Sequence, residues 1–160
     1  MSRPTDIAAE IKASLGAEWL PRMYEEKVRS QRTRSYKLDI PVRENRADIQ
    51  YTLLGIELKV GKKRFACPDL ATARYLRVFA RLGCRDFALP YDISQISGIA
   101  DELETSWQRT LILIAAAAKG DSDVNKAVIK ALRSDITTIG PGDAMPLFDR
   151  ETRRREKAKD

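Results

Sequence analysis

The residues best suited to chemistry in this chain are two acids and a lysine, Asp48, Glu57 and Lys59. Glu57 and Lys59 alternate with apolar residues in the stretch Ile56–Val60, and Asp48 opens the preceding stretch of strand-like sequence. Because side chains alternate along a β-strand, we expect Glu57 and Lys59 to share one face. Two carboxylates on adjacent strands could hold Mg²⁺ or Mn²⁺, and a nearby lysine could position a phosphate or its attacking water.

The chain contains no histidine, which excludes every mechanism that needs an imidazole base. Any catalysis must therefore use carboxylates, lysine, tyrosine or a metal. The two cysteines, Cys67 and Cys84, lie in apolar stretches. Two thiols without histidine do not make a structural zinc site, so we expect both to be reduced core residues.

The positive charge is concentrated in one part of the sequence. The chain has a net charge of +6, and residues 59–85 hold eight basic residues but only one acid, Asp69. Clustered positive charge favours a polyanionic partner such as nucleic acid. The candidate phosphate-binding residues are Lys62, Lys63, Arg64, Arg74, Arg77 and Arg81. The alternative is that the three arginines form only a solvated helix face.

Periodicity and capping residues predict the elements that position these side chains. The predicted strands span residues 36–40, 48–54, 56–60, 64–67 and 84–91. The predicted helices span residues 5–15, 19–28, 70–82 and 98–119, with a last helix that starts at Asp121 or Asp123. The best-defined element is the helix 70–82, which has Asp69 as its N-cap and Gly83 as its stop.

Together these elements predict one α/β domain over residues 1–139. We expect a small mixed sheet flanked by helices, with the core order helix, three strands, helix, strand, and a helical C-terminal third. Residues 140–160 are predicted to be a linker and a basic, disordered tail. The longest apolar run, Leu111–Ala118, is too short to cross a bilayer, so we expect no membrane span and a cytoplasmic protein.

The predicted helix 98–119 is apolar on all sides in its second half. A helix of this kind is buried on several sides. Two arrangements would bury it: another helix of the same chain, or a second copy of the protein in a homodimer. The sequence leaves both open.

The strand-borne acid and Glu-x-Lys pattern resembles the PD-(D/E)xK nuclease superfamily over about residues 19–91. The resemblance implies a metal-dependent nuclease acting on DNA or RNA, with Asp48 and Glu57 as ligands of Mg²⁺ or Mn²⁺ and Lys59 as the catalytic lysine. It also implies an acid from the first helix, for which Glu25 or Glu26 is a candidate and Glu10 a more distant one. The helix 70–82 would then run beside the nucleic acid.

Three other interpretations remain open at this point. In the first, Glu57 and Lys59 are ordinary residues on the solvent face of a strand, and Asp48 is a turn residue. Two further Glu-x-Lys tripeptides, at 10–12 and 25–27 in predicted helices, show that the pattern also arises by chance. The chain could also be a non-catalytic nucleic-acid-binding module, or an adaptor protein that self-associates through its long helix.

Overall fold

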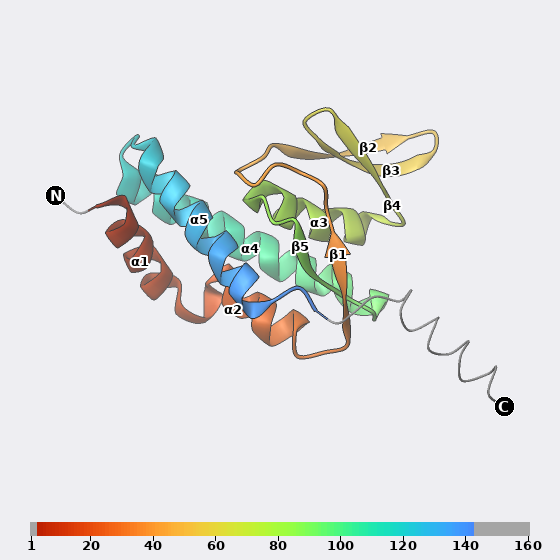
Figure 1. The fold of residues 1–160 in the computed structure, drawn as a ribbon, viewed down its shortest axis with the longest axis horizontal. Helices are drawn as coiled ribbons and strands as arrows, with labels where there is room; N and C mark the ends of the chain where they lie inside the picture. The colour runs from red at the N-terminus through yellow and green to blue at the C-terminus, as the bar shows by residue number, and fades with distance from the viewer. Residues whose placement is uncertain (1–2, 143–160) are drawn as a thin grey trace.

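The structure is a computed structural model that describes residues 3–142 (Figure 1). Its helices are α1 (Pro4–Leu15), α2 (Leu20–Met23), α3 (Leu70–Leu82), α4 (Ile93–Ala118) and α5 (Ser122–Ile139), with short helical turns at Gly16–Glu18 and Tyr24–Val28. Its strands are β1 (Thr33–Lys37), β2 (Ala47–Thr52), β3 (Gly55–Val60), β4 (Lys63–Cys67) and β5 (Asp86–Pro90). The predicted α/β class and the helical C-terminal third are confirmed.

The strands form two antiparallel sheets, where the sequence predicts one small mixed sheet. β1 pairs with β5, while β2, β3 and β4 form a separate meander with β3 in the middle. The division follows from where β1 ends, because the predicted strand 36–40 stops at Lys37. The amide of Ile40 bonds back to the carbonyl of Leu38 at 3.0 Å, and this tight turn redirects the chain.

Helix α3 lies between α4 and the meander β2–β3–β4, and it confirms the sequence prediction at both ends (Figure 1). The carboxylate of Asp69 accepts a bond from the amide of Thr72 at 2.7 Å. Gly83 ends the helix with a positive φ of 77°, and a Cβ there would lie 2.3 Å from the carbonyl oxygen of Arg43. Only glycine therefore fits this helix end.

Four aromatic side chains form the centre of the core between α3 and the sheet β1–β5. Phe79 and Phe87 stack with their ring centroids 4.3 Å apart, and Tyr24 and Tyr75 pack around Phe79. The Tyr24 hydroxyl donates to the carbonyl of Gly140 at 2.6 Å and accepts from the amide of Ala88 at 2.7 Å. Burial raises the pKa of Tyr24 to about 12, so this bridge keeps its proton at neutral pH.

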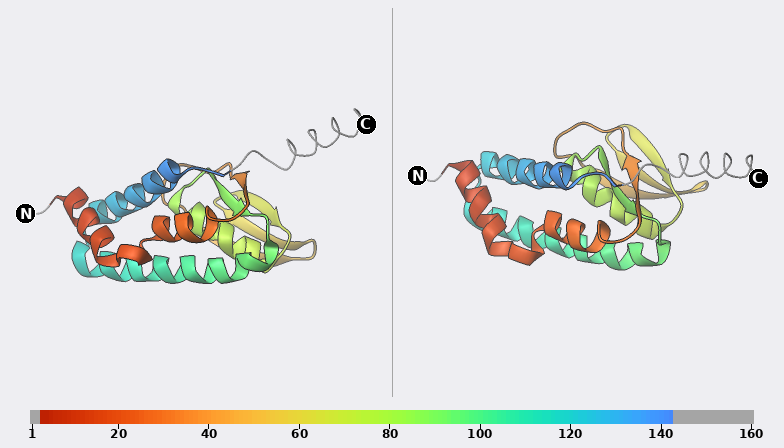
Figure 2. Two further views of the ribbon diagram at one scale, coloured as in Figure 1. Left: turned by 90° about the horizontal axis from the view of Figure 1, so that it is seen from below. Right: turned by 60° about the horizontal axis from the view of Figure 1, so that its bottom comes forward.

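Helix α4 is longer than predicted and runs along most of the length of the molecule (Figure 2). It begins at Ile93, five residues before Gly98, because Asp92 caps it by accepting from the amide of Ser94 at 3.0 Å. The helices α1, α2 and α5 pack beside it. Asp101 and Glu104 in its first half contact arginines of α3, and its apolar second half lies toward the other end of the molecule.

Both cysteines, Cys67 and Cys84, are free and buried, as predicted. Burial raises the pKa of each thiol, to about 12 for Cys84, which keeps them protonated. Within residues 3–142 no helix has the length and apolar character needed to cross a membrane. The predicted tail lies outside the described residues from position 143 onward.

Candidate functional site

The three residues singled out by their chemistry lie on one face of the meander β2–β3–β4. Asp48 on β2 is directly opposite Lys59 on β3, and Glu57 lies two residues before Lys59 on the same face. The other face carries Ala47, Leu58 and Val60, which are buried. We call the first face the polar face; it consists of Asp48, Gln50, Glu57, Lys59, Arg64 and Ala66.

Glu57 is the most enclosed acid of the polar face. Its side chain is only 20% exposed, and its Oε2 atom is buried without a hydrogen-bond partner within residues 3–142. The nearest cation is Arg64 on β4, whose Nη1 lies 3.9 Å from Oε2. A buried carboxylate oxygen without a hydrogen bond is costly, so this atom is suited to accept a cation or a donor from a ligand.

Asp48 and Lys59 face each other across β2 and β3 but form no ion pair. The Oδ2 atom of Asp48 instead pairs with Nε of Arg46 at 3.2 Å, and both side chains are more than half exposed. Asp48 is diagonal to Glu57 across the two strands, a relation that puts Cα atoms about 7–8 Å apart. Two carboxylates at that spacing can contribute to one divalent cation, with Gln50 opposite Glu57 as a third oxygen donor.

The donor set of the polar face suits a hard cation but is small. Among residues 3–142 no group of three or more histidine, cysteine, aspartate or glutamate side chains is placed to hold a metal. The acids suggested from the first helical region do not join this face: Glu26 lines a cleft with Asp101 and Glu102, and Glu25 lines another with Asp135. Asp48 and Glu57 would therefore hold Mg²⁺ with water or phosphate oxygens completing its coordination.

The three basic residues after β3 have different surroundings. Lys62 is exposed in the turn between β3 and β4, and Arg64 is exposed on the polar face. Lys63 points elsewhere, since its Nζ donates to the carboxylate of Asp39 at 2.8 Å. That hydrogen bond, with a second from Arg85, lowers the pKa of Asp39. Lys62 and Arg64 are thus better placed than Lys63 to meet a phosphate.

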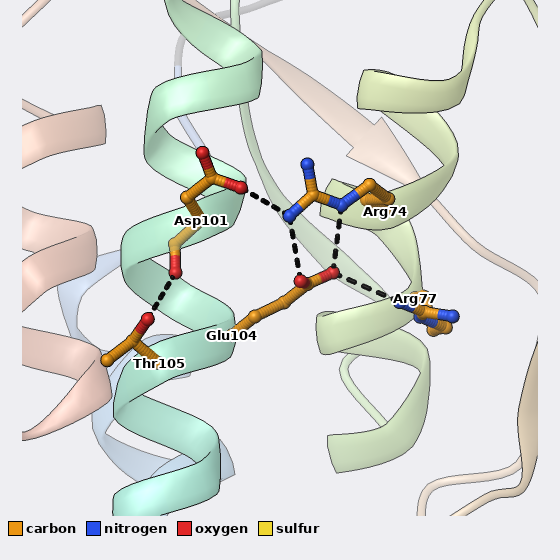
Figure 3. A network of polar contacts seen from close by, with 5 residues as sticks. All are labelled: Arg74, Arg77, Asp101, Glu104 and Thr105. Atoms are coloured by element: carbon orange, nitrogen blue, oxygen red, sulfur yellow. Dashed lines mark hydrogen bonds and ion pairs between the residues drawn. The ribbon is translucent and has the colours of Figure 1, made fainter.

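Two of the three arginines on α3 are held by carboxylates of α4 (Figure 3). Arg74 donates through Nη2 and Nε to Glu104 at 2.8 and 3.3 Å, and also to Asp101. Arg77 donates to the same Glu104 at 3.1 Å. Each of these two arginine side chains is about one-quarter exposed. This network gives them a structural role between helices, which lowers the support for the predicted phosphate contacts.

Arg81 differs from its two neighbours on α3. Its side chain is partly buried and makes no hydrogen bond or ion pair within the described part of the chain. Burial and the nearby charge of Arg77 lower its pKa, and they outweigh the opposite effect of the charges of Glu104 and Asp48. Of the three helical arginines, Arg81 therefore keeps the capacity to bind an anion.

The sequence interpretation missed the α4 carboxylates that neutralise Arg74 and Arg77. A signal for them was present, because Asp101 and Glu104 are three residues apart on an acidic helix, as Arg74 and Arg77 are on a basic one. Residues at that spacing share a helix face. Their meeting, however, depends on how α3 packs against α4, and this is a tertiary contact.

Comparisons with protein-family models, curated proteins and solved structures gave no match to this chain. A function for it must therefore be inferred from its own site, since a fold by itself does not specify an activity.

Proposed function

We propose that the polar face binds a nucleic-acid phosphodiester and hydrolyses it with the help of a divalent cation. The observation that carries the proposal is the buried Oε2 of Glu57, which has no hydrogen-bond partner within residues 3–142 and lies on the same sheet face as Asp48 and Lys59. A divalent cation bound there would supply Lewis-acid activation of water and of the phosphate. The PD-(D/E)xK-like order of acid, acid and lysine supports the same interpretation.

Each residue of the polar face has a distinct part in this proposal. Asp48 and Glu57 would hold Mg²⁺ or Mn²⁺, and binding would transfer Asp48 from its exposed pair with Arg46 to the metal. Lys59 on β3 lies opposite Asp48 on β2 and Arg64 on β4. It would stabilise a phosphate oxygen and orient the water. Arg64 and Lys62 would contact flanking phosphates.

The test is cleavage of plasmid DNA, single-stranded DNA and RNA by the purified protein with Mg²⁺ or Mn²⁺. We expect metal-dependent cleavage that Glu57→Ala and Lys59→Ala each reduce by about a hundredfold or more, because each removes charge stabilisation from the reaction. Lys37→Ala is the matched control, since Lys37 is an exposed lysine on β1. Cleavage that survives both polar-face substitutions would refute the proposal.

A second candidate is a nucleic-acid-binding module without catalysis. The Arg46–Asp48 pair favours it, because it occupies one of the two acids that a metal requires. This candidate predicts binding that weakens steeply with salt but does not depend on metal. Cleavage by the wild type and its loss in Glu57→Ala would exclude it.

For the nuclease and for the binding module alike, the expected cytoplasmic location stays a prediction.

We also propose that α4 mediates self-association. Its Ile114 is buried within the chain, but Ile112 is 67% exposed and Ala115, Ala116 and Ala117 are exposed. Small side chains beside an exposed isoleucine allow a second helix to approach closely. A second copy of this chain would cover that surface.

A further inference from the structure

An open cleft lies beside the polar face, between the segment that precedes β2, the end of α3 and the middle of α4. Its volume is about 480 Å³. It is connected to the polar face by Arg46, which lines the cleft and pairs with Asp48 at 3.2 Å. Its lining includes Glu44, Arg46, Arg81, Trp107, Gln108 and Leu111. We call it the Arg81 cleft.

The guanidinium of Arg81 makes no hydrogen bond or ion pair with residues 3–142, although the charges of Glu104 and Asp48 act on it from a greater distance. One and two turns earlier on α3, Arg77 and Arg74 are bound by Glu104. The next turn of α4 presents Trp107 and Gln108 to the cleft instead of a carboxylate. The side chain of Arg81 is partly buried, and burial disfavours its charge. Its donors are not taken up by the protein, so they can bind an anionic ligand.

The rest of the cleft also suits a phosphorylated ligand. Arg46 provides a second guanidinium, and the amide of Gln108 is exposed on α4. Glu44 is a carboxylate in this lining, and it accepts a hydrogen bond from Asn125 at 2.5 Å. Leu111 adds an apolar wall beside Trp107. Two arginines beside an apolar wall fit a phosphate attached to a nucleoside.

We propose that the Arg81 cleft binds a phosphate group of a nucleotide, as the subsite for a strand whose neighbouring phosphodiester lies on the polar face. This identity of the ligand rests on the proposed function, whereas the preference for an oxyanion rests on Arg81 itself. The site would read the backbone and not the bases, because its charged donors are guanidiniums that favour bidentate phosphate contacts.

The first test uses adenosine monophosphate and inorganic phosphate, with tryptophan fluorescence as the readout. The chain has two tryptophans. Trp107 lines the cleft, and Trp19 bonds to Asp135 elsewhere. We expect the nucleotide to change the fluorescence in the wild type and in Trp19→Phe, but not in Trp107→Phe. Inorganic phosphate should compete with it, because the phosphate group is the feature recognised.

The second test compares binding of the same nucleotide and of a labelled single-stranded oligonucleotide by charge variants. We expect Arg81→Gln to weaken the binding of both ligands about tenfold. It should also reduce the slope of the logarithm of the oligonucleotide binding constant against the logarithm of the salt concentration by about 1. Arg81→Lys should retain part of the affinity. Arg22→Gln, an exposed arginine on α2, is the matched control and should bind like the wild type. Thermal unfolding should show Arg81→Gln at least as stable as the wild type, because it removes an unpaired charge.

Equal affinity of the wild type and Arg81→Gln for both ligands would overturn the proposal. The outcome is separable from that of the proposed function. If Glu57→Ala abolishes cleavage but nucleotide binding does not depend on Arg81, the cleft proposal fails alone. If Arg81-dependent binding is found in a protein that cleaves nothing, the cleft proposal stands and the hydrolytic function fails.

Discussion

At the scale of single residues, Glu104 determines which arginines of α3 remain available. It binds Arg74 and Arg77 together, and no acid of α4 reaches the cleft lined by Arg81. Burial alone would raise the pKa of Glu104, but the hydrogen bonds from Arg74 and Arg77 outweigh it, so the pKa is lowered from its ordinary 4.5. Folding therefore stabilises the charged form of this carboxyl group.

Replacing Glu104 by glutamine should reveal this linkage. We expect Glu104→Gln to lower the free energy of unfolding by about 1–2 kcal/mol at pH 7, because two charge-assisted contacts are weakened. A group with a lowered pKa stabilises the fold above its unfolded pKa and loses that contribution as the pH falls through its folded pKa. The difference between variant and wild type should therefore shrink below pH 4.5. Urea unfolding at several pH values measures it.

The control for this experiment is Glu102→Gln, since Glu102 is exposed on the same helix. It should change stability by only a few tenths of a kcal/mol at any pH. If the difference in the free energy of unfolding between wild type and Glu104→Gln stayed constant from pH 7 to pH 3, the assigned role of the carboxylate would be contradicted.

The candidate site itself could be predicted only in part from residues. The alternation of Ile56–Val60 was enough to place Glu57 and Lys59 on one face, because strand geometry is local. Placing Asp48 opposite Lys59 also requires the register between β2 and β3. The short hairpin that joins these strands fixes that register. The enclosure of Glu57 was not predictable, since it depends on neighbours that are distant in sequence.

At the scale of elements, the end of α3 is held by a close backbone contact. Gly83 combines a positive φ with a backbone neighbour, Arg43, that leaves no space for a Cβ. The same contact holds the segment before β2 against α3, where the amide of Asn45 donates to the carbonyl of Arg81 at 3.1 Å. The position of the polar face therefore depends on this helix end.

Substitution of this glycine should destabilise the protein strongly. We expect Gly83→Ala to lower the free energy of unfolding by about 2–4 kcal/mol, through the cost of the left-handed conformation and the clash with Arg43. Gly98→Ala is the matched control, because Gly98 lies inside α4 with open space around its Cα. It should stabilise by about 0.5–1 kcal/mol. Thermal and urea unfolding of both variants distinguish the two effects, and equal effects would contradict this account.

Elements with local signals were predicted better than those defined by pairing. Asp69 and Gly83 marked both ends of α3. The start of α4 was misplaced at Gly98 because Ser97, just before it, is also a favourable N-cap residue, whereas the actual cap is Asp92. The split into two sheets was not predictable, since nothing in the sequence of β1 specifies β5 as its partner.

At the scale of the whole molecule, the surface of α4 determines whether the chain acts alone. The sequence left two ways to bury its second half, and the structure contains both features: Ile114 is covered by the chain, while Ile112 is exposed. An exposed apolar surface on a long helix is typical of an interface.

We expect the wild type to sediment as a dimer at high protein concentration and Ile112→Glu to sediment as a monomer. The substitution places a charge in the proposed interface without disturbing a buried side chain. Val42→Glu is the matched control, because Val42 is also exposed but lies outside α4. Sedimentation velocity measures the difference, and a wild-type monomer at high concentration would contradict the proposed self-association.

The division into two sheets has a consequence for how this protein can evolve. The meander β2–β3–β4 packs on α3 through Ala47, Leu58 and Val60, whereas its polar face contributes little to the core. Positions 48, 50, 59 and 64 can therefore change with little effect on folding. A new ligand preference could be acquired there by a few substitutions, while the aromatic core around Phe79 stays unchanged.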